Sequence, residues 1–313
     1  MIIYAIMEKL KAAVIGLGHL GHHHARIYSQ LPHVTLAAVC DINQKLARKI
    51  ASHNNASFVT DYKELIGKID AVSIAVPTDL HFKIAKDCLE NNIHCLVEKP
   101  ITNDIIQAQQ LADIAEKQKL ILQVGHVERF NSAVRAVQHY VANPRFIECH
   151  RMGPFKKRSL DVGIVLDLMI HDIDIIMFLV QSPVTNIEAV GANVLTNYED
   201  IANARLKFAN GAIANISASR LSATEMRKIR IFQPDAYISL DYVKKAAVIF
   251  KKSAKHRITR SNIPIKVKDA LEEELGSFVN CIQQNQKPLV SGAEATEALR
   301  IALEITSCIK NSS

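Results

Sequence analysis

The stretch Val14-Ile15-Gly16-Leu17-Gly18-His19-Leu20-Gly21 decides the fold expected for this chain. It has the spacing G-x-G-x-x-G, follows an apolar run from Lys11 to Ile15, and opens a helix-like segment from His19 to Leu31. In such a strand, turn and helix, the glycines allow a tight turn, a close approach to pyrophosphate and close packing of helix on strand. Free N–H groups and the positive helix end then face the phosphates. The expected dinucleotide contacts are Gly16, Gly18, His19, Leu20 and Gly21.

Asp41 ends the next apolar run, Val34 to Cys40, about 20 residues after the last glycine of the motif. A carboxylate at this position binds both hydroxyls of the adenosine ribose and repels a 2′-phosphate. Ile42 and Asn43 come next, so no arginine follows directly to favour that phosphate. The sequence therefore predicts NAD as the cofactor, with NADP as the less favoured alternative.

Strand-like and helix-like segments alternate as far as residue 124. After the first two strands we expect helices at residues 43–53, 62–66, 81–91 and 103–118, and strands at 71–76, 93–97 and 120–124. This alternation predicts a doubly wound parallel sheet, the Rossmann fold, with its ligand crevice at the carboxyl ends of the strands. It also argues against an empty turn as the alternative for the glycine motif. Further cofactor contacts are expected at Pro77, Thr78, Glu98 and Lys99.

The pattern changes at Gly125, so we divide the chain into a cofactor domain, 1–124, and a second domain, 125–313. Asn210-Gly211 in the second domain is a strong hairpin signal. Its expected helices are 128–141, 163–181, 271–286 and 293–310, and its expected strands are 145–151, 205–208, 212–219, 227–232, 237–240 and 246–250. The fold class is thus α/β, followed by an α+β domain whose open, mainly antiparallel sheet has helices on one face. The other face could hold a partner subunit in a homodimer or homotetramer.

Two groups of polar residues could carry chemistry. Lys99 ends a strand beside the expected nicotinamide, where its ammonium group can hydrogen-bond a substrate oxygen; the alternative is a surface lysine. Asp167 and His171 lie four residues apart in an apolar helix and so share a face. The carboxylate would raise the proton affinity of the imidazole, as a general base requires; the alternative is a structurally satisfied pair.

The polar segment from Gly125 to Asn131 joins the two domains at the crevice. Substrate contacts are expected there from His126, Glu128, Arg129 and Asn131, in addition to Asp167 and His171. The alternative is a capped helix start with Arg129 in a structural ion pair. We expect no metal at His19 and His22 to His24, because neighbouring residues radiate around a helix and cannot converge on one ion.

Composition indicates an ordinary globular protein of 313 residues, 49% of them apolar. No apolar run approaches the roughly 20 residues that span a bilayer. Met1 to Met7 lacks the basic start and cleavage site of a secretory signal, so we expect a tail or a start upstream of Met7. The six cysteines have no C-x-x-C spacing and fit reduced thiols in the cytoplasm.

The formal charge of +7 is concentrated between Lys244 and Lys268, where nine basic residues occur without an acidic one. Such a surface attracts anions, including substrate phosphates. The alternative is a solvated sheet edge that carries lysines against aggregation. Aromatic residues make up 5% of the chain and no nucleic-acid module is recognisable, so nucleic acid is not the expected partner.

The glycine motif, Glu98-Lys99-Pro100, the Gly125 to Asn131 segment and the Asp167 to Asp174 helix occur in a characteristic order. In this order the chain resembles, over nearly its whole length, the glucose-fructose oxidoreductase, inositol dehydrogenase and rhizopine catabolism protein family (Gfo/Idh/MocA). The resemblance implies pyrophosphate binding by the three glycines and ribose binding by Asp41. It also implies a catalytic group of Lys99, Asp167 and His171, and a cis peptide bond before Pro100.

Within this family, Gly-His-Val-Glu-Arg-Phe-Asn followed by Asp-Leu-Met-Ile-His-Asp is most similar to UDP-N-acetylglucosamine 3-dehydrogenases. The similarity implies oxidation of a sugar hydroxyl, at C3 of a UDP-N-acetylhexosamine, in lipid A or surface glycan synthesis. The alternatives are a dehydrogenase of a free sugar or polyol such as inositol, and a catalytically silent NAD-binding sensor or partner protein. Met169 stands where the family commonly has glycine, which predicts a bulkier pocket wall.

Overall fold

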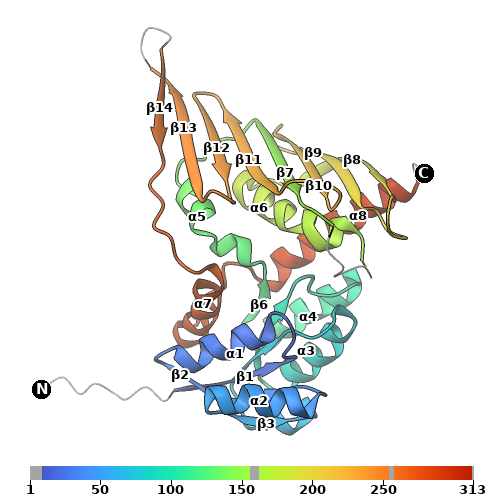
Figure 1. Ribbon diagram of the computed structural model, residues 1–313, viewed down its shortest axis with the longest axis vertical. Coiled ribbons are helices and arrows are strands. Elements are labelled where there is room, and N and C mark those ends of the chain that lie inside the picture. The colour runs from blue at the N-terminus through green and yellow to red at the C-terminus, as the bar shows by residue number, and fades with distance from the viewer. Residues whose placement is uncertain (1–8, 156–161, 254–256, 312–313) are drawn as a thin grey trace, which may run out of the picture. The chain divides into compact units, whose positions relative to one another are not determined.

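The computed structural model describes residues 9–155, 162–253 and 257–311. The chain forms two compact units (Figure 1). Unit 1 consists of Met1–Val127 and Leu271–Thr296, and unit 2 of Glu128–Ala270 and Glu297–Ser313. The sequence predicted one division at residue 124, whereas the chain returns to unit 1 for residues 271–296. The expectations for Met1 to Met7 and for Lys255 fall outside the described residues.

Unit 1 contains the predicted parallel sheet. Its six strands lie in the order β3-β2-β1-β4-β5-β6, and all neighbouring pairs are parallel. The strands are β1 (Leu10–Ile15), β2 (Val34–Cys40), β3 (Ser57–Val59), β4 (Ala71–Ile74), β5 (His94–Glu98) and β6 (Leu122–Gly125). The predicted ranges omit β3, because three residues are too few to show a period. The Rossmann fold is confirmed.

Helices cover both faces of this sheet. They are α1 (Gly21–Gln30), α2 (Gln44–Asn54), α3 (His81–Glu90) and α4 (Ile105–Gln118), with short 3₁₀ turns at Tyr62–Leu65 and Thr78–Leu80. The chain first moves outward from β1 to β3 and then crosses back to β4. Right-handed crossovers therefore place α1 and α2 on one face and α3 and α4 on the other.

Helix α7 (Ala270–Gln284) explains why the chain returns to unit 1. Its side chains Leu275 and Phe278 are fully buried in one cluster with Tyr28 of α1 and Leu96 of β5. They complete the core on the face that α1 and α2 cover in part. Periodicity shows which face of a helix is apolar but not which partner it meets, so the sequence placed this helix in the second domain.

Unit 2 contains an eight-stranded sheet in the order β14-β13-β12-β11-β7-β10-β9-β8. Among the described pairs of this sheet only β7 and β10 are parallel, so the mainly antiparallel sheet is confirmed. The strands are β7 (Phe146–Met152), β8 (Val184–Ala192), β9 (Ile201–Phe208), β10 (Ile213–Ser219), β11 (Met226–Gln233), β12 (Ala236–Asp241), β13 (Ala246–Lys252) and β14 (Ile258–Asn262). The Asn210-Gly211 hairpin joins β9 to β10, with Gly211 at a φ of +82°. The predicted ranges omit the two edge strands, β8 and β14.

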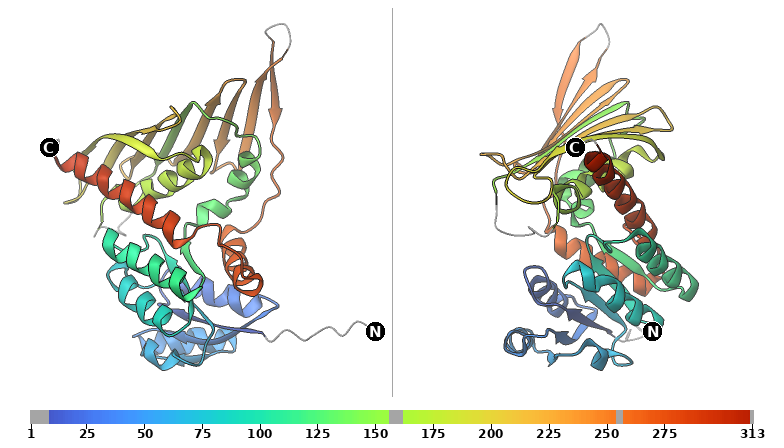
Figure 2. Two further views of the ribbon diagram at one scale, coloured as in Figure 1. Left: turned by 180° about the vertical axis from the view of Figure 1, so that it is seen from behind. Right: turned by 90° about the vertical axis from the view of Figure 1, so that its right-hand side faces the viewer.

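The helices of unit 2 lie on one face of its sheet, as the right-hand view of Figure 2 shows. They are α5 (Ser132–Gln138), α6 (Ile170–Val180) and the part of α8 (Gly292–Asn311) that belongs to this unit. Alternate strand residues such as Ile147, Ile231 and Ile238 are buried beneath them. No described helix of unit 2 covers the other face of the sheet. All six cysteines are free thiols, and among the described residues no helix is long and apolar enough to span a membrane.

Candidate active site

The glycine-rich turn between β1 and α1 has the geometry that its spacing predicts. Gly16 has a φ of +86°, and a Cβ there would lie 2.6 Å from the carbonyl oxygen of Ala75. A Cβ on Gly21 would overlap the carbonyl oxygen of Gly16. Around Gly18, by contrast, no atom lies within 4 Å of the position that a Cβ would take. This side of the turn is therefore open to a ligand that approaches the backbone closely.

A cavity of about 800 Å³ lies beside this turn, at the carboxyl ends of β1, β2 and β4. The volume is within the range of small-molecule and cofactor sites. Four of the predicted cofactor residues line it: Gly16, Gly18, Asp41 and Pro77. The described lining does not include His19, Leu20, Gly21, Thr78, Glu98 or Lys99. It does include residues that the sequence reasoning missed, among them Ile42, Thr60, Asp61, Tyr62, Leu80 and Lys83.

The carboxylate of Asp41 is held at the edge of this cavity by two backbone hydrogen bonds. One oxygen accepts from the N–H of Leu17 in the glycine turn at 2.8 Å, and the other accepts from the N–H of Asn43 at 2.8 Å. A carboxylate oxygen has two lone pairs, so each can accept a further bond from a hydroxyl group. The acceptors of Asp41 and the open turn at Gly18 fit the ribose and the pyrophosphate of a dinucleotide.

The end of β5 carries the predicted Glu98-Lys99-Pro100 group. The Glu98 carboxylate is buried, with one oxygen 3.2 Å from Nε2 of His24 on α1, and the other accepts a 3.3 Å hydrogen bond from the N–H of Lys99. The Lys99–Pro100 peptide bond is cis, as the resemblance implies. The Glu98 carboxylate is therefore buried and contacts His24 and the backbone of Lys99. Its expected contact with a cofactor stays a prediction.

Asp167 and His171 lie on two different kinds of helical turn. Asp167 belongs to a π-helical turn, Val165–Met169, and His171 follows it in the first turn of α6. The sequence predicted one continuous helix, because the apolar pattern is the same in both. π-Helical turns occur often at functional sites, and both side chains are half-buried.

The start of this π-helical turn is fixed by Glu199, a residue distant in sequence. The carbonyl oxygen of Glu199 accepts from the N–H of Ile164 at 2.9 Å, and its carboxylate accepts from the N–H of Val165 at 3.3 Å. A Cβ on Gly163 would overlap that carboxylate. Glycine is therefore required where the chain enters the turn that carries Asp167.

Two buried ion pairs hold α6 just after His171, at Asp172 and Asp174. Arg151 of β7 binds Asp172 through two hydrogen bonds of 2.8 Å. Arg129 binds Asp174 through bonds of 2.7 and 3.0 Å. The sequence could not name the partners of these two acidic residues, because the arginines lie on separate elements. For Arg129, the structural ion pair that was the alternative is the one that forms.

The other predicted substrate residues have structural roles too. Glu128 accepts a 3.0 Å hydrogen bond from Arg151 and another of 3.0 Å from Asn131. The side chain of Asn131 caps α5 by accepting from the N–H of Ala133. His126, in unit 1, is fully buried. Their contacts with a substrate remain predictions.

Two arginine side chains line one cavity of unit 2 together with Asp167. A small cavity of about 50 Å³ is lined by Asp167, Arg220, Glu225 and Arg227, together with Gly153, Pro154 and Leu168. Arg227 forms an ion pair with Glu225 at 3.0 Å, and its side chain is 34% exposed. Its guanidinium group also lies 4.0 Å from the Glu128 carboxylate, so it faces two carboxylates while the side chain stays partly exposed.

The basic stretch from Lys244 to Lys268 contributes largely to a sheet edge. β14 is the outermost strand, and all five of its residues are exposed. Lys251 and Lys252 at the end of β13 are exposed as well. This arrangement agrees with the alternative that charged side chains protect an edge strand from pairing with another chain.

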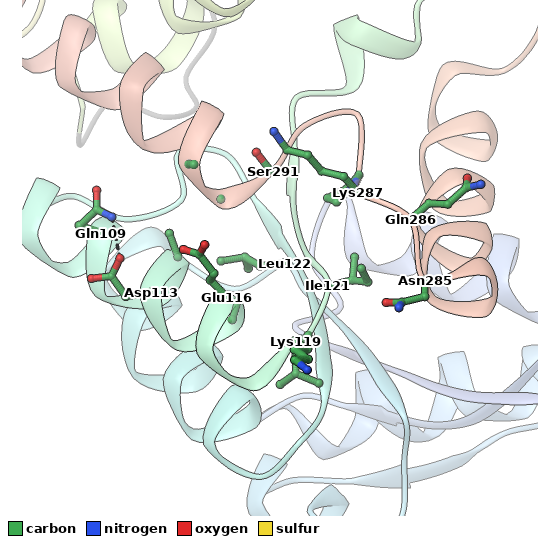
Figure 3. A pocket seen from close by; sticks show the side chains of 16 residues that line it. Gln109, Asp113, Glu116, Lys119, Ile121, Leu122, Asn285, Gln286, Lys287 and Ser291 are labelled. Carbon is green, nitrogen blue, oxygen red and sulfur yellow. Dashed lines mark hydrogen bonds between the residues drawn. The ribbon is translucent and has the colours of Figure 1, made fainter.

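A second cavity of unit 1, of about 470 Å³, lies at the amino end of β6, between α4 and the loop that joins α7 to α8 (Figure 3). The start of α8 beside it is already capped, because Ser291 and Glu294 hydrogen-bond each other's side chains and N–H groups. The cavity is at the opposite end of the strands from the glycine turn. It is not the cofactor site.

The parallel sheet, the glycine turn and the acidic residue that ends β2 define a dinucleotide-binding protein of the Rossmann class. Residues 10–126 match the model of an oxidoreductase family with an NAD-binding Rossmann fold, and residues 125–238 match the GFO/IDH/MocA C-terminal domain. The chain is 33% identical to UDP-N-acetylglucosamine 3-dehydrogenase of Acidithiobacillus ferrooxidans over 305 residues, 96% of this chain and 97% of that protein.

The solved structure of that enzyme, GnnA, superposes with a TM-score of 0.92 and covers 97% of this chain and 99% of its own. Myo-inositol 2-dehydrogenase of Thermotoga maritima is 25% identical over 312 residues, 93% of each chain. The protein therefore belongs to the Gfo/Idh/MocA family. It is an NAD-binding oxidoreductase that acts on a CH–OH group.

Proposed function

We propose that this protein oxidises the C3 hydroxyl of a UDP-N-acetylhexosamine, with NAD as the hydride acceptor. The proposed substrate rests on the 33% identity to a UDP-N-acetylglucosamine 3-dehydrogenase along almost the full length of both chains. The fold alone would serve many sugars, since the inositol dehydrogenase shares it at 25% identity. We place the reaction in the cytoplasm, in lipid A or surface glycan synthesis.

In the proposed reaction His171 removes the hydroxyl proton while the C–H bond breaks. Asp167 orients the imidazole and stabilises its protonated form. Lys99 donates a hydrogen bond to the reacting oxygen as it becomes a carbonyl. When bound at the glycine turn, NAD supplies the acceptor for the hydride. The protein's part is thus to bind the sugar, hold the proton on an imidazole nitrogen and stabilise the oxygen.

Asp41 supports NAD in preference to NADP. Its carboxylate faces the cavity while both oxygens are anchored by backbone N–H groups, so it cannot easily turn away from an added 2′-phosphate. Two negative groups would then lie together, which is unfavourable.

The arginines near Asp167 support an anionic substrate. Arg227 is partly exposed and lines a cavity with Asp167, the proposed partner of the general base, and guanidinium groups bind phosphate oxygens well. This position favours the UDP-linked sugar over a free polyol, which carries no charge. A free sugar or polyol is the second candidate, favoured by the inositol dehydrogenase relative. A catalytically silent NAD-binding protein is the third.

A panel of UDP-sugars and free polyols, incubated with protein and NAD, tests the proposal through the absorbance of reduced nicotinamide. Turnover of UDP-N-acetylglucosamine or its C4 epimer, with oxidation located at C3 by mass spectrometry of the trapped ketone, is expected. Turnover of a polyol alone would favour the second candidate. NAD binding without turnover of any sugar would favour the silent protein.

A further inference from the structure

His81, the first residue of α3, has no role in the proposed reaction, and its side chain contacts two backbone carbonyl groups. The side chain is 1% exposed. Nδ1 lies 2.9 Å from the carbonyl oxygen of Pro100, and Nε2 lies 2.9 Å from the carbonyl oxygen of Val76. One ring therefore bridges two backbone segments.

These two segments leave neighbouring strands of the sheet at their carboxyl ends. Val76 follows β4 and lines the cofactor cavity with Ala75 and Pro77. Pro100 follows β5 and comes directly after Lys99. The bridge thus joins a wall of the cofactor cavity to the segment that carries the proposed catalytic lysine.

A carbonyl oxygen only accepts hydrogen bonds, so each ring nitrogen has to donate. A neutral imidazole has one N–H and the imidazolium has two, so the ring makes both bonds fully when protonated. Burial is the largest effect and holds the pKa of His81 below its ordinary value, although the carbonyls of Pro100 and Val76, the Glu98 carboxylate and the backbone of Ile101 favour the cation. The neutral ring donates through one nitrogen at a time, so the two bonds to Pro100 and Val76 share one proton unless the ring is protonated. Glu98 of β5 is the charged group that faces the ring, and it is in turn 3.2 Å from His24 of α1.

We propose that His81 is a positioning residue that ties the Lys99–Pro100 segment to the Val76 wall of the cofactor site. The bond to Val76 fixes the wall that NAD contacts, and the bond to Pro100 fixes the backbone from which Lys99 extends. The second half of this inference rests on the proposed role of Lys99, and the first half does not.

Two substitutions separate the two bonds. The amide nitrogen of Asn occupies nearly the place of Nδ1, so His81→Asn keeps the bond to Pro100 and loses the bond to Val76. The amide nitrogen of Gln occupies nearly the place of Nε2, so His81→Gln keeps the bond to Val76. Loss of a buried bond leaves a carbonyl unsatisfied and costs about 1 to 3 kcal/mol, which is about fivefold or more in a constant.

We therefore expect His81→Asn to raise the Kd for NAD, measured by calorimetry, about fivefold or more with kcat nearly unchanged. We expect His81→Gln to lower kcat about fivefold or more with the Kd nearly unchanged. Equal changes in both variants, or no change in either, would overturn the proposal. The control is His53→Gln, whose ring also contacts a backbone carbonyl, that of Lys49, but at the exposed end of α2.

Two further readouts keep the test independent of substrate and of variant folding. If the wild-type protein oxidises no sugar, the proposed function fails, yet the opposite NAD affinities of the Asn and Gln variants still decide the bond to Val76. In the wild-type protein, ¹⁵N-edited spectra should show a His81 ring proton protected from exchange with solvent. A rapidly exchanging ring would overturn the bridge without any substitution.

Discussion

His171 is the residue on which the proposed chemistry depends most directly. General base assistance accelerates reactions about a hundredfold to ten-thousandfold, so His171→Asn should lower kcat by a factor in that range. The described cofactor cavity is lined by unit 1 alone, so the Kd for NAD should stay within about twofold. Stopped-flow turnover and calorimetry measure the two quantities.

The matched control for this prediction is His139→Asn, because His139 is an exposed histidine of the same unit. It should leave both constants unchanged. Turnover of His171→Asn at the wild-type rate would contradict the assignment of the general base.

Asp41 should set the choice between the two nicotinamide cofactors. Asp41→Ala removes the acceptor for ribose hydroxyls and the charge that repels a 2′-phosphate, so the ratio of the Kd for NADP to that for NAD should fall about tenfold or more. Calorimetric titration of both cofactors measures the ratio. The exposed Asp235→Ala is the control. An unchanged ratio would mean that another wall residue, such as Lys83, decides the preference.

At the residue scale, the sequence predicted which residue types matter better than what each of them contacts. Gly16, Gly18 and Asp41 follow from a motif whose spacing implies its own geometry. Arg129 does not, because its partner Asp174 is 45 positions away and only the fold brings the two together. Arg151 was missed for the same reason: nothing along β7 shows that it meets Asp172.

Among the elements, the loop between β8 and β9 depends on a single carboxylate. Asp200 accepts from the N–H groups of Val194, Leu195 and Thr196 at 2.8, 2.6 and 3.0 Å, and from the Thr196 hydroxyl at 2.8 Å. Burial alone would raise the pKa of Asp200, but these bonds to the ionised form lower it to about 2.

A lowered carboxylate pKa stabilises the folded protein above the ordinary value of about 3.9, and the gain is lost as the pH falls toward 2. Asp200→Asn should therefore lower the free energy of unfolding by about 2 kcal/mol at pH 7 and by clearly less at pH 3. Urea unfolding at both pH values measures this, with Asp235→Asn as the control. A loss of equal size at both would contradict the role of the charge.

A buried ion pair between Arg151 and Asp172 holds helix α6, and a pair of apolar side chains of similar size should hold it as well. Arg151→Met leaves the carboxylate of Asp172 buried without its partner, which should cost about 3 to 5 kcal/mol in urea unfolding. The double variant Arg151→Met with Asp172→Leu should recover most of that loss. Arg230→Met, at the more exposed pair with Glu148, should cost less than about 1 kcal/mol. A double variant as unstable as the single one would show that Arg151 acts through Glu128 instead.

The π-helical turn could not be predicted from the sequence. Its residues have the same apolar pattern as an α-helix, so the sequence offered no reason to divide residues 163–181. The edge strand β14 was missed because all five of its residues are exposed, and such a strand lacks the alternation that marks a half-buried one. The other edge strand, β8, was missed although alternate residues from Ile187 to Gly191 are half-buried. The strands of the parallel sheet were predicted from short apolar runs and those of the antiparallel sheet from alternation, although β9 begins at Ile201, four residues before the predicted 205.

For the whole molecule, the order of the motifs predicted the family. The sequence could not predict that the chain returns from unit 2 to unit 1. The return of α7 to unit 1 depends on Leu275 and Phe278 meeting Tyr28, and this partnership exists only once the sheet has formed. The identity of the substrate could not be predicted from the motifs either. The residues named for it from sequence, Glu128, Arg129 and Asn131, have hydrogen-bond partners within unit 2, and their contacts with a substrate stay predictions.

The face of the unit 2 sheet that no described helix of this unit covers carries a row of aromatic side chains. Phe146, Phe232, Tyr237 and Phe250 form a row on this face, with ring centroids 5.6, 4.8 and 5.3 Å apart along it. Each alternates with a buried isoleucine on the helix side, namely Ile147, Ile231, Ile238 and Ile249. Aromatic side chains are enriched in subunit interfaces, and a charge buried among them is costly.

We therefore propose that this row lies in the contact of a homodimer or homotetramer and expect Tyr237→Glu to give monomers in multi-angle light scattering at concentrations where the wild-type protein is oligomeric. The control is Lys228→Glu, which puts the same charge on the same face two residue rows away, beside Asp241. The Kd for NAD should not change in either variant, because the described cofactor cavity consists of unit 1 residues. A Tyr237→Glu variant that keeps the wild-type mass would place the contact between subunits elsewhere and leave this aromatic row to stabilise the sheet itself.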